Sequence, residues 1–310
     1  MRKISGRILL ALGGFLLVAG VLATAWAPGV VKKTPIDVDT TTYLSGTVQK
    51  LNADTGELES HPIKILSQTK NDTDASTDTT GVWVQTACVV LNDDGNAPNC
   101  VDATDPRLVS ATVDVFATDR VSGLAVNDAG LLPADAVPHD GLVNKFPFDS
   151  AKTTYPYWDS TIGKAVDAVY QGTEDIAGVQ TYKYVVTIKD APIEILDGVQ
   201  GTYDNVATIY VEPKTGAIQQ QTQDQQRYLE DGTQVLDLKA EFTPEQVQTF
   251  ADDAHTNMGQ LTLMLVVIPL VGFIGGGLAV LGGAALLLTG RRRSEDETTA
   301  DRQASVSLGG

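Results

Sequence analysis

The chain has 310 residues, and its 39 acidic residues outnumber 22 basic ones to give a formal net charge of −17. This excess of acid argues against nucleic acid as a partner, because nucleic-acid binding needs clustered lysine and arginine. It also argues against simple docking on anionic lipid headgroups, which attract basic segments.

The first apolar segment covers residues 8–27 and reads ILLALGGFLLVAGVLATAWA. A helix of about 20 apolar residues crosses the core of a bilayer, so this segment predicts a transmembrane helix. Its Ala25-x-Ala27 ending has the small-residue pattern of a cleavage site, but the apolar run exceeds the roughly 7–15 residues of a signal-peptide core. We therefore favour an uncleaved anchor, whereas cleavage would leave a domain held by a single helix.

Residues 28–260 are expected to form one large extracytoplasmic domain, with 35 acidic and 15 basic residues. Runs with a period of two, separated by Gly, Asn, Asp and Pro clusters, predict strands here. These runs are Tyr43–Lys50, Val82–Leu91, Ser110–Thr118, Tyr182–Ile188, Ala207–Val211 and Gln234–Leu238. The expected fold is a mostly β, antiparallel domain between two transmembrane helices.

Two stretches of this domain resemble each other. Val115–Gly123 and Ile209–Gly216 both contain a strand, an acidic residue and a turn that ends in Ser/Thr-Gly. Two readings stay open: an internal duplication with lipid-carrier-like halves at 40–145 and 150–242, or the chance likeness of two β-hairpins.

Two cysteines, Cys88 and Cys100, lie close together in the expected extracytoplasmic domain. In an oxidising compartment such a pair predicts a disulfide. A metal or redox site is less favoured, because the spacing is not CxxC and no histidine accompanies it.

No pattern for catalysis or cofactor binding is found. The three histidines stand outside any motif, and no nucleophile, zinc or phosphate-loop signature occurs. Residues 72–78 resemble the start of a calcium loop, but Thr77 and Trp83 replace the required Gly and Glu. We expect a non-enzymatic protein with no catalytic residue, cofactor or metal.

A helix is predicted over residues 243–256, immediately before the second apolar segment. Thr243 is a good N-cap, Pro244 suits the first helical position, and Gln246 occupies the third position of a capping box. This juxtamembrane helix leads into residues 261–289 (LTLMLVVIPLVGFIGGGLAVLGGAALLLT), a second predicted transmembrane helix that Pro269 should kink.

Small residues in the second segment predict a helix-pairing face. Gly272 and Gly276, then Ala279 and Gly283, have the spacing that allows close helix contact. The first segment offers Gly13, Gly14 and Gly20. The anchors are expected to pair with each other or with a larger membrane protein, although glycine is also simply frequent in membrane helices.

Basic residues indicate the orientation. Arg2, Lys3 and Arg7 precede the first helix, and Arg291–Arg293 follow the second, so both ends should be cytoplasmic. Lys32 and Lys33 lie on the opposite flank and weaken this bias. The expected protein is a two-pass protein of the inner (plasma) membrane, with residues 1–7 and a disordered tail, 290–310, in the cytoplasm.

A cluster of aromatic residues is a candidate ligand site. It consists of Phe146, Phe148, Tyr155, Tyr157 and Trp158, interrupted by prolines 147 and 156. Aromatic side chains line apolar pockets and stack on sugars, so they could contact a lipid or a sugar. The favoured alternative is a packed core or connector.

Three motifs carry a family resemblance: KFPFD at 145–149, TYPYWD at 154–159 and YVEPKTG at 210–216. With the two-helix arrangement, the chain resembles the actinobacterial "porin PorA family" along essentially its whole length. The resemblance implies an envelope protein of a mycolic-acid-containing bacterium, related to lipoglycan and mycolate transport accessory proteins. The turn with Glu212, Pro213, Thr215 and Gly216 also resembles a hairpin of lipid carriers, although such a sequence makes a tight turn in any β domain.

The main functional hypothesis is a non-enzymatic accessory protein that binds or helps to traffic a mycolate glycolipid or lipoglycan precursor. Its partners would be a membrane lipid or glycolipid and a membrane lipid exporter. The first alternative is an adaptor that docks on the exporter without binding lipid. The second is a porin or channel component, ranked last because a β-type pore needs lipid-facing strands.

Overall fold

The computed structural model of the protein describes residues 2–52 and 54–289, so Arg291–Arg293 and the expected tail lie outside the described residues. The chain forms two compact units. One contains the described residues before 32 and after 257, and the other contains residues 32–257. Each is described by itself below as the helical unit and the β unit.

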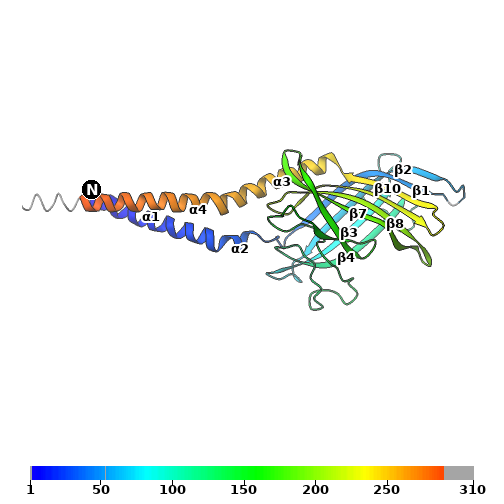
Figure 1. Ribbon diagram of the computed structural model, residues 1–310, viewed down its shortest axis with the longest axis horizontal. Coiled ribbons are helices and arrows are strands. Elements are labelled where there is room, and N and C mark those ends of the chain that lie inside the picture. The colour runs from blue at the N-terminus through cyan, green and yellow to red at the C-terminus, as the bar shows by residue number, and fades with distance from the viewer. Residues whose placement is uncertain (1, 53, 290–310) are drawn as a thin grey trace, which may run out of the picture. The chain divides into compact units, whose positions relative to one another are not determined.

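The helical unit contains the two apolar segments as helices. The N-terminal part is α1 (Arg2–Ala25) followed by α2 (Ala27–Val31). The C-terminal helix begins as α3 (Pro244–Thr262), whose residues up to 257 belong to the β unit, and continues through η1 (Leu263–Val267), α4 (Ile268–Leu270) and η2 (Val271–Gly275). It is helical as far as the described residues reach, to residue 289. By length and composition, both helices could cross a membrane. Figure 1 shows α1 and α4 running side by side.

The C-terminal helix is irregular around Pro269. A π-helical turn precedes α4 and another follows it. Proline lacks the N–H that a regular helix uses and crowds the preceding turn, so wider turns beside it relieve both problems.

The β unit is a single ten-stranded sheet in which every neighbouring pair is antiparallel. The strands are β1 (Asp39–Leu51), β2 (Leu58–Asp72), β3 (Thr80–Leu91), β4 (Leu108–Asp119), β5 (Tyr155–Asp159), β6 (Lys164–Ile176), β7 (Val179–Leu196), β8 (Val199–Val211), β9 (Ile218–Leu229) and β10 (Gln234–Phe242). Their order is β4-β3-β2-β1-β10-β9-β8-β7-β6-β5.

The predicted fold class is therefore confirmed: an antiparallel β region lies between two apolar helices in the sequence. All six predicted runs fall inside strands. The ranges considered as duplicated halves belong to one continuous sheet, because β1 pairs with β10 from Leu44↔Phe242 to Lys50↔Leu236.

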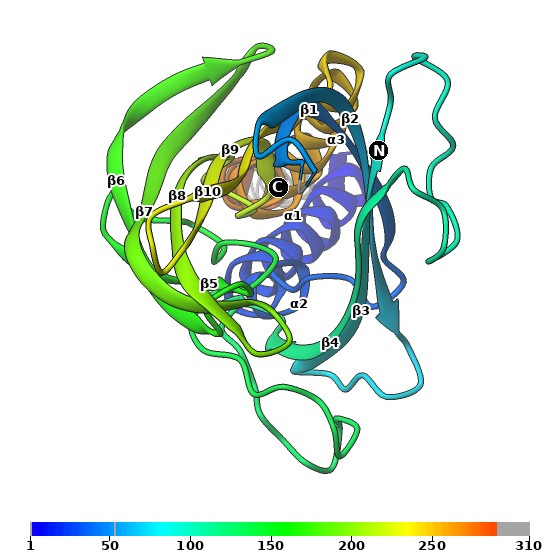
Figure 2. The same ribbon diagram turned by 90° about the vertical axis from the view of Figure 1, so that its right-hand side faces the viewer.

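The sheet curls strongly, and its apolar face is the concave one. Figure 2 shows a curved wall with β6 and β7 on one side and β3 and β4 on the other. One apolar cluster, centred on Val48 and Ile63, consists entirely of strand residues, and both of these side chains are buried. Since no helix or loop residue belongs to this cluster, curvature of the sheet itself must bury it. A second cluster on the same face is centred on Tyr184 and Ile209.

The segment between β4 and β5 links the two edge strands. Isolated bridges run from Thr118 to Ala125, from Leu124 to Leu142 and from Leu142 to Tyr157. Leu142 is fully buried in the second apolar cluster. These bridges satisfy edge backbone groups that would otherwise be open to pairing with other chains.

The start of α3 is fixed to the sheet. The Thr243 hydroxyl accepts a hydrogen bond from the Gln246 N–H at 3.2 Å, as expected of an N-cap. The Gln246 side chain does not return to Thr243 but accepts from the Tyr43 N–H at 3.1 Å on β1. The second bond of the capping box is thus replaced by a bond to the sheet.

Candidate functional site

Glycines bring the two apolar helices into close contact. A Cβ atom added at Gly272 would lie 2.7 Å from the Gly20 Cα atom, and one at Gly276 would lie 2.9 Å from the Gly13 carbonyl oxygen. Gly283 faces Gly6 in the same way, with 2.8 Å to its carbonyl oxygen. Backbone therefore packs directly on backbone, as in other membrane helix pairs that use small residues.

The contacting glycines of α1 repeat every seven residues, at positions 6, 13 and 20. This heptad spacing is the signal that sequence reasoning missed, since it adds Gly6 to the face and removes Gly14, which meets no other atom within 4 Å. On the C-terminal helix Ala279 is half-buried, and it is Val280 whose side chain crowds Gly13.

A disulfide joins Cys88 of β3 to Cys100 in the following loop, with 5.6 Å between the Cα atoms. Cys88 and Val90 pack with Ala97 from the same loop. The bond therefore holds the loop over the end of β3.

One end of the sheet, where β1 begins and β10 ends, gathers the motifs that the sequence singled out; we call it the junction end. The β8–β9 turn lies here, and its Glu212 side chain is buried. The carboxylate accepts hydrogen bonds from the N–H groups of Lys214 and Thr215, both at 2.8 Å, and from the Thr215 hydroxyl at 2.6 Å. Gly216 has a φ of 76°, which glycine adopts without strain.

The KFPFD segment docks on this turn. The Phe146 N–H donates to the Gly216 carbonyl at 2.9 Å, and the Ser150 N–H donates to the Pro213 carbonyl at 2.8 Å. A Cβ at Gly216 would overlap the Phe146 carbonyl, so glycine is required for this contact. The structure thus brings together two motifs that lie about 65 residues apart in the chain.

Three of the aromatic candidates, Phe146, Tyr155 and Tyr157, contact one another in the core. Phe146 is fully buried and stacks on Tyr184 with 4.6 Å between ring centroids, and Tyr155 and Tyr157 lie within 5.7 Å of it. Trp158 is elsewhere and packs on His139 at 4.4 Å. Phe148 is only partly buried and lies under the Lys145 ammonium group at 3.9 Å.

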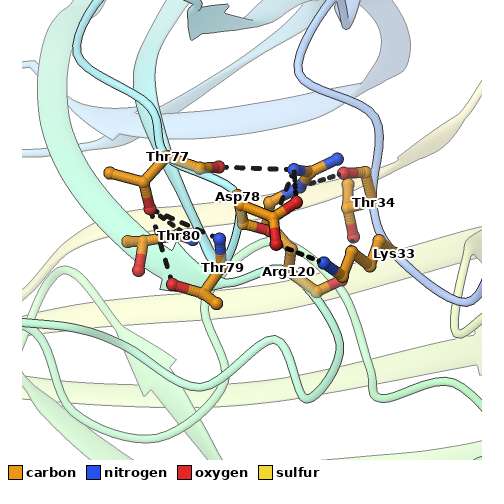
Figure 3. A network of polar contacts seen from close by, with 7 residues as sticks. All are labelled: Lys33, Thr34, Thr77, Asp78, Thr79, Thr80 and Arg120. Carbon is orange, nitrogen blue, oxygen red and sulfur yellow. Dashed lines mark hydrogen bonds and ion pairs between the residues drawn. The ribbon is translucent and has the colours of Figure 1, made fainter. Parts of the chain in front are cut away.

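Arg120, just beyond β4, joins three segments at the junction end (Figure 3). Its guanidinium donates to the carbonyl of Thr34 at 2.7 Å, and to those of Thr77 at 3.3 Å and Asp78 at 3.1 Å. The Asp78 carboxylate also pairs with Lys33 at 2.8 Å. Lys33, which weakened the orientation signal in the sequence, therefore has a structural partner in the β unit.

Lys145 and Lys32 tie the same region to the KFPFD segment. The Lys145 ammonium donates to the Thr34 hydroxyl at 2.8 Å, and Lys32 forms an ion pair with Asp149. Desolvation lowers the pKa of Lys145 to about 7, with partial opposition from the charge of Asp119. The junction end is thus a dense polar cluster that fixes the first residues of the β unit.

The middle of the concave face of β9 is polar, which sequence reasoning did not anticipate. Directly paired residues of neighbouring strands share a face. Gln221, Gln223 and Arg227 pair with Ile209, Ala207 and Tyr203 of the second apolar cluster. Between Ile218 and Leu229, which also pair onto this face, the residues of β9 on it are Gln221, Gln223, Gln225 and Arg227.

Comparison with known proteins finds a family model that matches most of the chain and a relative that matches about a third of it. A family model described as "Porin PorA" matches residues 5–285, which include both apolar helices and the β unit. The "Porin PorA" protein of Corynebacterium amycolatum is 31% identical over 111 residues, covering 34% of this chain. The alignment spans only 28% of that relative.

These matches show that the sequence-based hypothesis of a lipid-carrying accessory protein is wrong. The matched family is named for porins, and nothing in it supports lipid transport or a mycolate role. The comparisons instead favour the second alternative, a porin or channel component, which was ranked last because a β-type pore needs lipid-facing strands. Paired apolar helices are, however, a second way to satisfy backbone groups in a bilayer, so missing lipid-facing strands do not exclude a channel.

Proposed function

We propose that this chain, which belongs to the Porin PorA family, is a subunit of a membrane channel for hydrophilic solutes. The observation that carries the proposal is the family match across residues 5–285, because it includes the membrane helices as well as the β unit. The family points to a non-enzymatic membrane protein.

The proposed orientation is two-pass, with both termini in the cytoplasm and the β unit outside. Arg2, Lys3 and Arg7 before the first helix and the arginines at 291–293 support it. The disulfide between Cys88 and Cys100 is also expected in an oxidising, extracytoplasmic compartment.

The proposed pore is built by several copies of the chain. The two helices of one chain are strongly apolar and already contact each other through glycines, which leaves no room for water at those contacts. Large apolar side chains such as Ile8, Phe15 and Leu22 are exposed on α1 and are available to lipid or to neighbouring copies. An aqueous path therefore needs an assembly of subunits.

The expected channel favours cations. Residues 28–260 carry a net charge of −20, and acidic groups near a pore mouth raise the local concentration of cations. Purified full-length protein in planar bilayers should give discrete conductance steps. In a potassium chloride gradient, the reversal potential should have the sign of cation selectivity.

The test needs a control for contaminating pores. The Gly272→Val variant, prepared identically, should lose conductance because its helices cannot pack, whereas Gly277→Val should retain it, since a Cβ at Gly277 meets nothing within 4 Å. Silent bilayers with wild-type protein, or equal currents from both variants, would refute the channel proposal.

A further inference from the structure

The segment between β4 and β5 contains a loop, residues 127–139, whose two ends are tied together. The Asn127 side-chain amide donates to the His139 carbonyl at 2.7 Å, and the His139 N–H donates to the Asn127 side-chain oxygen at 3.0 Å. Just outside this pair, the Ala125 N–H donates to the Gly141 carbonyl at 2.8 Å. The 127–139 loop is therefore a compact loop with a closed neck, a type of loop that frequently has a function.

The side chain of His139 attaches this loop to the sheet. Its Nε2 atom lies 2.9 Å from a carboxylate oxygen of Asp114 on β4. The other hydrogen bonds of the loop stay within it, such as those from the N–H groups of Leu131 and Leu132 to the Asp128 carbonyl. In the part of the chain that the structure describes, the contact between His139 and Asp114 is thus the one polar link from the loop to a strand.

The imidazole of His139 is held in place from two sides. It packs between Phe116 of β4, with 5.2 Å between ring centroids, and Trp158 of β5, at 4.4 Å. His139 is 4% exposed, whereas the side chain of Asp114 is 32% exposed. The ring is therefore buried and fixed, and the carboxylate that it meets is open to water.

The partners of the ring determine how many protons it needs. The Nδ1 atom lies 2.8 Å from the Val137 carbonyl oxygen, which can only accept, and the Nε2 atom faces the Asp114 carboxylate, which also only accepts when it is ionised. A neutral imidazole has one N–H group, so only the doubly protonated, charged ring can make both bonds.

No second charge competes for this ring among the described residues. Phe116 from β4 and Trp158 from β5 are uncharged, and Asp114 is the one charged group that contacts the ring from the sheet. Asp140, the next residue in the chain, forms no hydrogen bond or ion pair with it. The protonation of His139 therefore decides whether one or two of its hydrogen bonds can form.

We propose that His139 is a pH-dependent clasp, which holds the 127–139 loop on β4 when the ring is protonated and releases the loop when the ring is neutral. The inference goes beyond the proposed channel and does not depend on it. Histidine side chains ordinarily titrate near pH 6.5, so the clasp responds to pH changes around neutrality.

The direction of the response follows from the two acceptors. At low pH the ring supplies both donors, and a rise in pH removes one proton and with it one of the two bonds. A hydrogen bond that involves a charged group changes an equilibrium by about ten- to hundredfold. The loop should therefore open about ten- to hundredfold more often in alkaline than in mildly acidic solution.

Hydrogen exchange of backbone amides tests the clasp in the purified full-length protein. The reporters are the N–H groups of Ala125 and His139, which are bonded across the neck of the loop. Exchange is followed by mass spectrometry from about pH 5.5 to about pH 8.5 and corrected for the intrinsic pH dependence of amide exchange. We expect the protection of residues 125–142 to fall about tenfold or more over this range, while the protection of β8 stays constant.

Two variants remove the clasp in different ways. His139→Gln cannot take up a proton, so its exchange in residues 125–142 should be fast and independent of pH. Asp114→Asn keeps the titrating ring but replaces the carboxylate by a neutral amide, so most of the pH dependence should be lost. Asp114 is partly exposed, which makes this second variant informative even if His139→Gln fails to fold.

The chain offers matched controls for the titrating group. It has three histidines, so His61→Gln and His255→Gln remove the other two and should leave the pH dependence of residues 125–142 intact. Burial lowers the pKa of Lys145 to about 7, which makes it a second group that titrates in this range. Lys145→Met should therefore also retain the response.

Three results would overturn the inference. Corrected exchange of residues 125–142 that does not change with pH in the wild type would show that the loop is held equally well by the neutral ring. A full pH response in both His139→Gln and Asp114→Asn would assign it to another group. Loss of the response in Lys145→Met, with His139 present, would transfer the switch to Lys145.

Discussion

Replacing Gly272 by valine should separate the two membrane helices. A Cβ at this position would lie 2.7 Å from the Gly20 Cα atom and 2.8 Å from the Leu16 carbonyl oxygen, whereas ordinary contacts begin at 3.4 Å. Both obstacles are backbone or fixed to it, so no side chain can rotate away. The helices must move apart by roughly 0.7 Å for the first carbon and further for the branched methyl groups.

The cost of this separation should be about 1–3 kcal/mol, the usual range for overpacking, which corresponds to about 5–150-fold in the pairing equilibrium. Its assay is disulfide cross-linking between Leu16→Cys and Gly275→Cys, since a Cβ at Gly275 lies 3.8 Å from the Leu16 Cδ1 atom. The oxidation rate should fall at least severalfold when Gly272→Val is added.

Gly277→Val is the control in the same helix, because a Cβ there meets nothing within 4 Å. It adds the same volume and the same β-branched side chain, so it corrects for changes in helix propensity. Equal cross-linking rates for the two variants would refute the argument that backbone contact at Gly272 holds the pair together.

Three further predictions concern the β unit. Reducing the bond between Cys88 and Cys100 should lower the free energy of unfolding by about 3 kcal/mol, measured by thermal or urea denaturation, and an unchanged midpoint would contradict this. Arg120→Met should lower the free energy of unfolding by about 2–3 kcal/mol because it removes charge-assisted bonds to three carbonyls. Arg107→Met, which loses an exposed ion pair with Asp105, should cost clearly less, and similar losses would argue against the Arg120 network. Burial lowers the pKa of Lys145 from its ordinary value of 10.5 to about 7 in the folded chain, so the unfolded state binds more protons between these values. The stability of the wild type relative to Lys145→Met should therefore rise from pH 7 to about pH 10, and a constant difference in urea denaturation would refute the shift.

The strands that could be predicted were those with apolar alternation. Tyr182–Ile188 places apolar side chains on the concave face with a period of two, and it lies inside a strand. Val82–Leu91 also lies inside a strand, but it carries apolar side chains on both faces of the sheet. β9 was not predicted because its sequence, IQQQTQDQQRYL, has no such alternation. Its pairing with β8 and β10 depends on backbone hydrogen bonds and on neighbours that are distant in sequence, which a local pattern cannot report.

The candidate sites were predictable to different degrees. Close helix contact could be predicted from glycine spacing, because regularly spaced small residues in an apolar segment are typical of helix–helix contacts in membranes. The docking of Phe146 on Gly216 could not be predicted from the sequence, because backbone atoms of two distant loops make the contact. The role of Arg120 was equally hidden, because its partners are carbonyl groups that every residue carries.

The pairing of β1 with β10 delays completion of the sheet until synthesis of the β unit is nearly finished. Leu44 and Phe242 are roughly 200 residues apart in the chain, so the centre of the sheet stays incomplete until the last strand has been synthesised. Until then β1 has an open edge, and the strands that follow it must be kept from pairing with other chains. A truncation that removes β10 would therefore disrupt the middle of the sheet, not its margin.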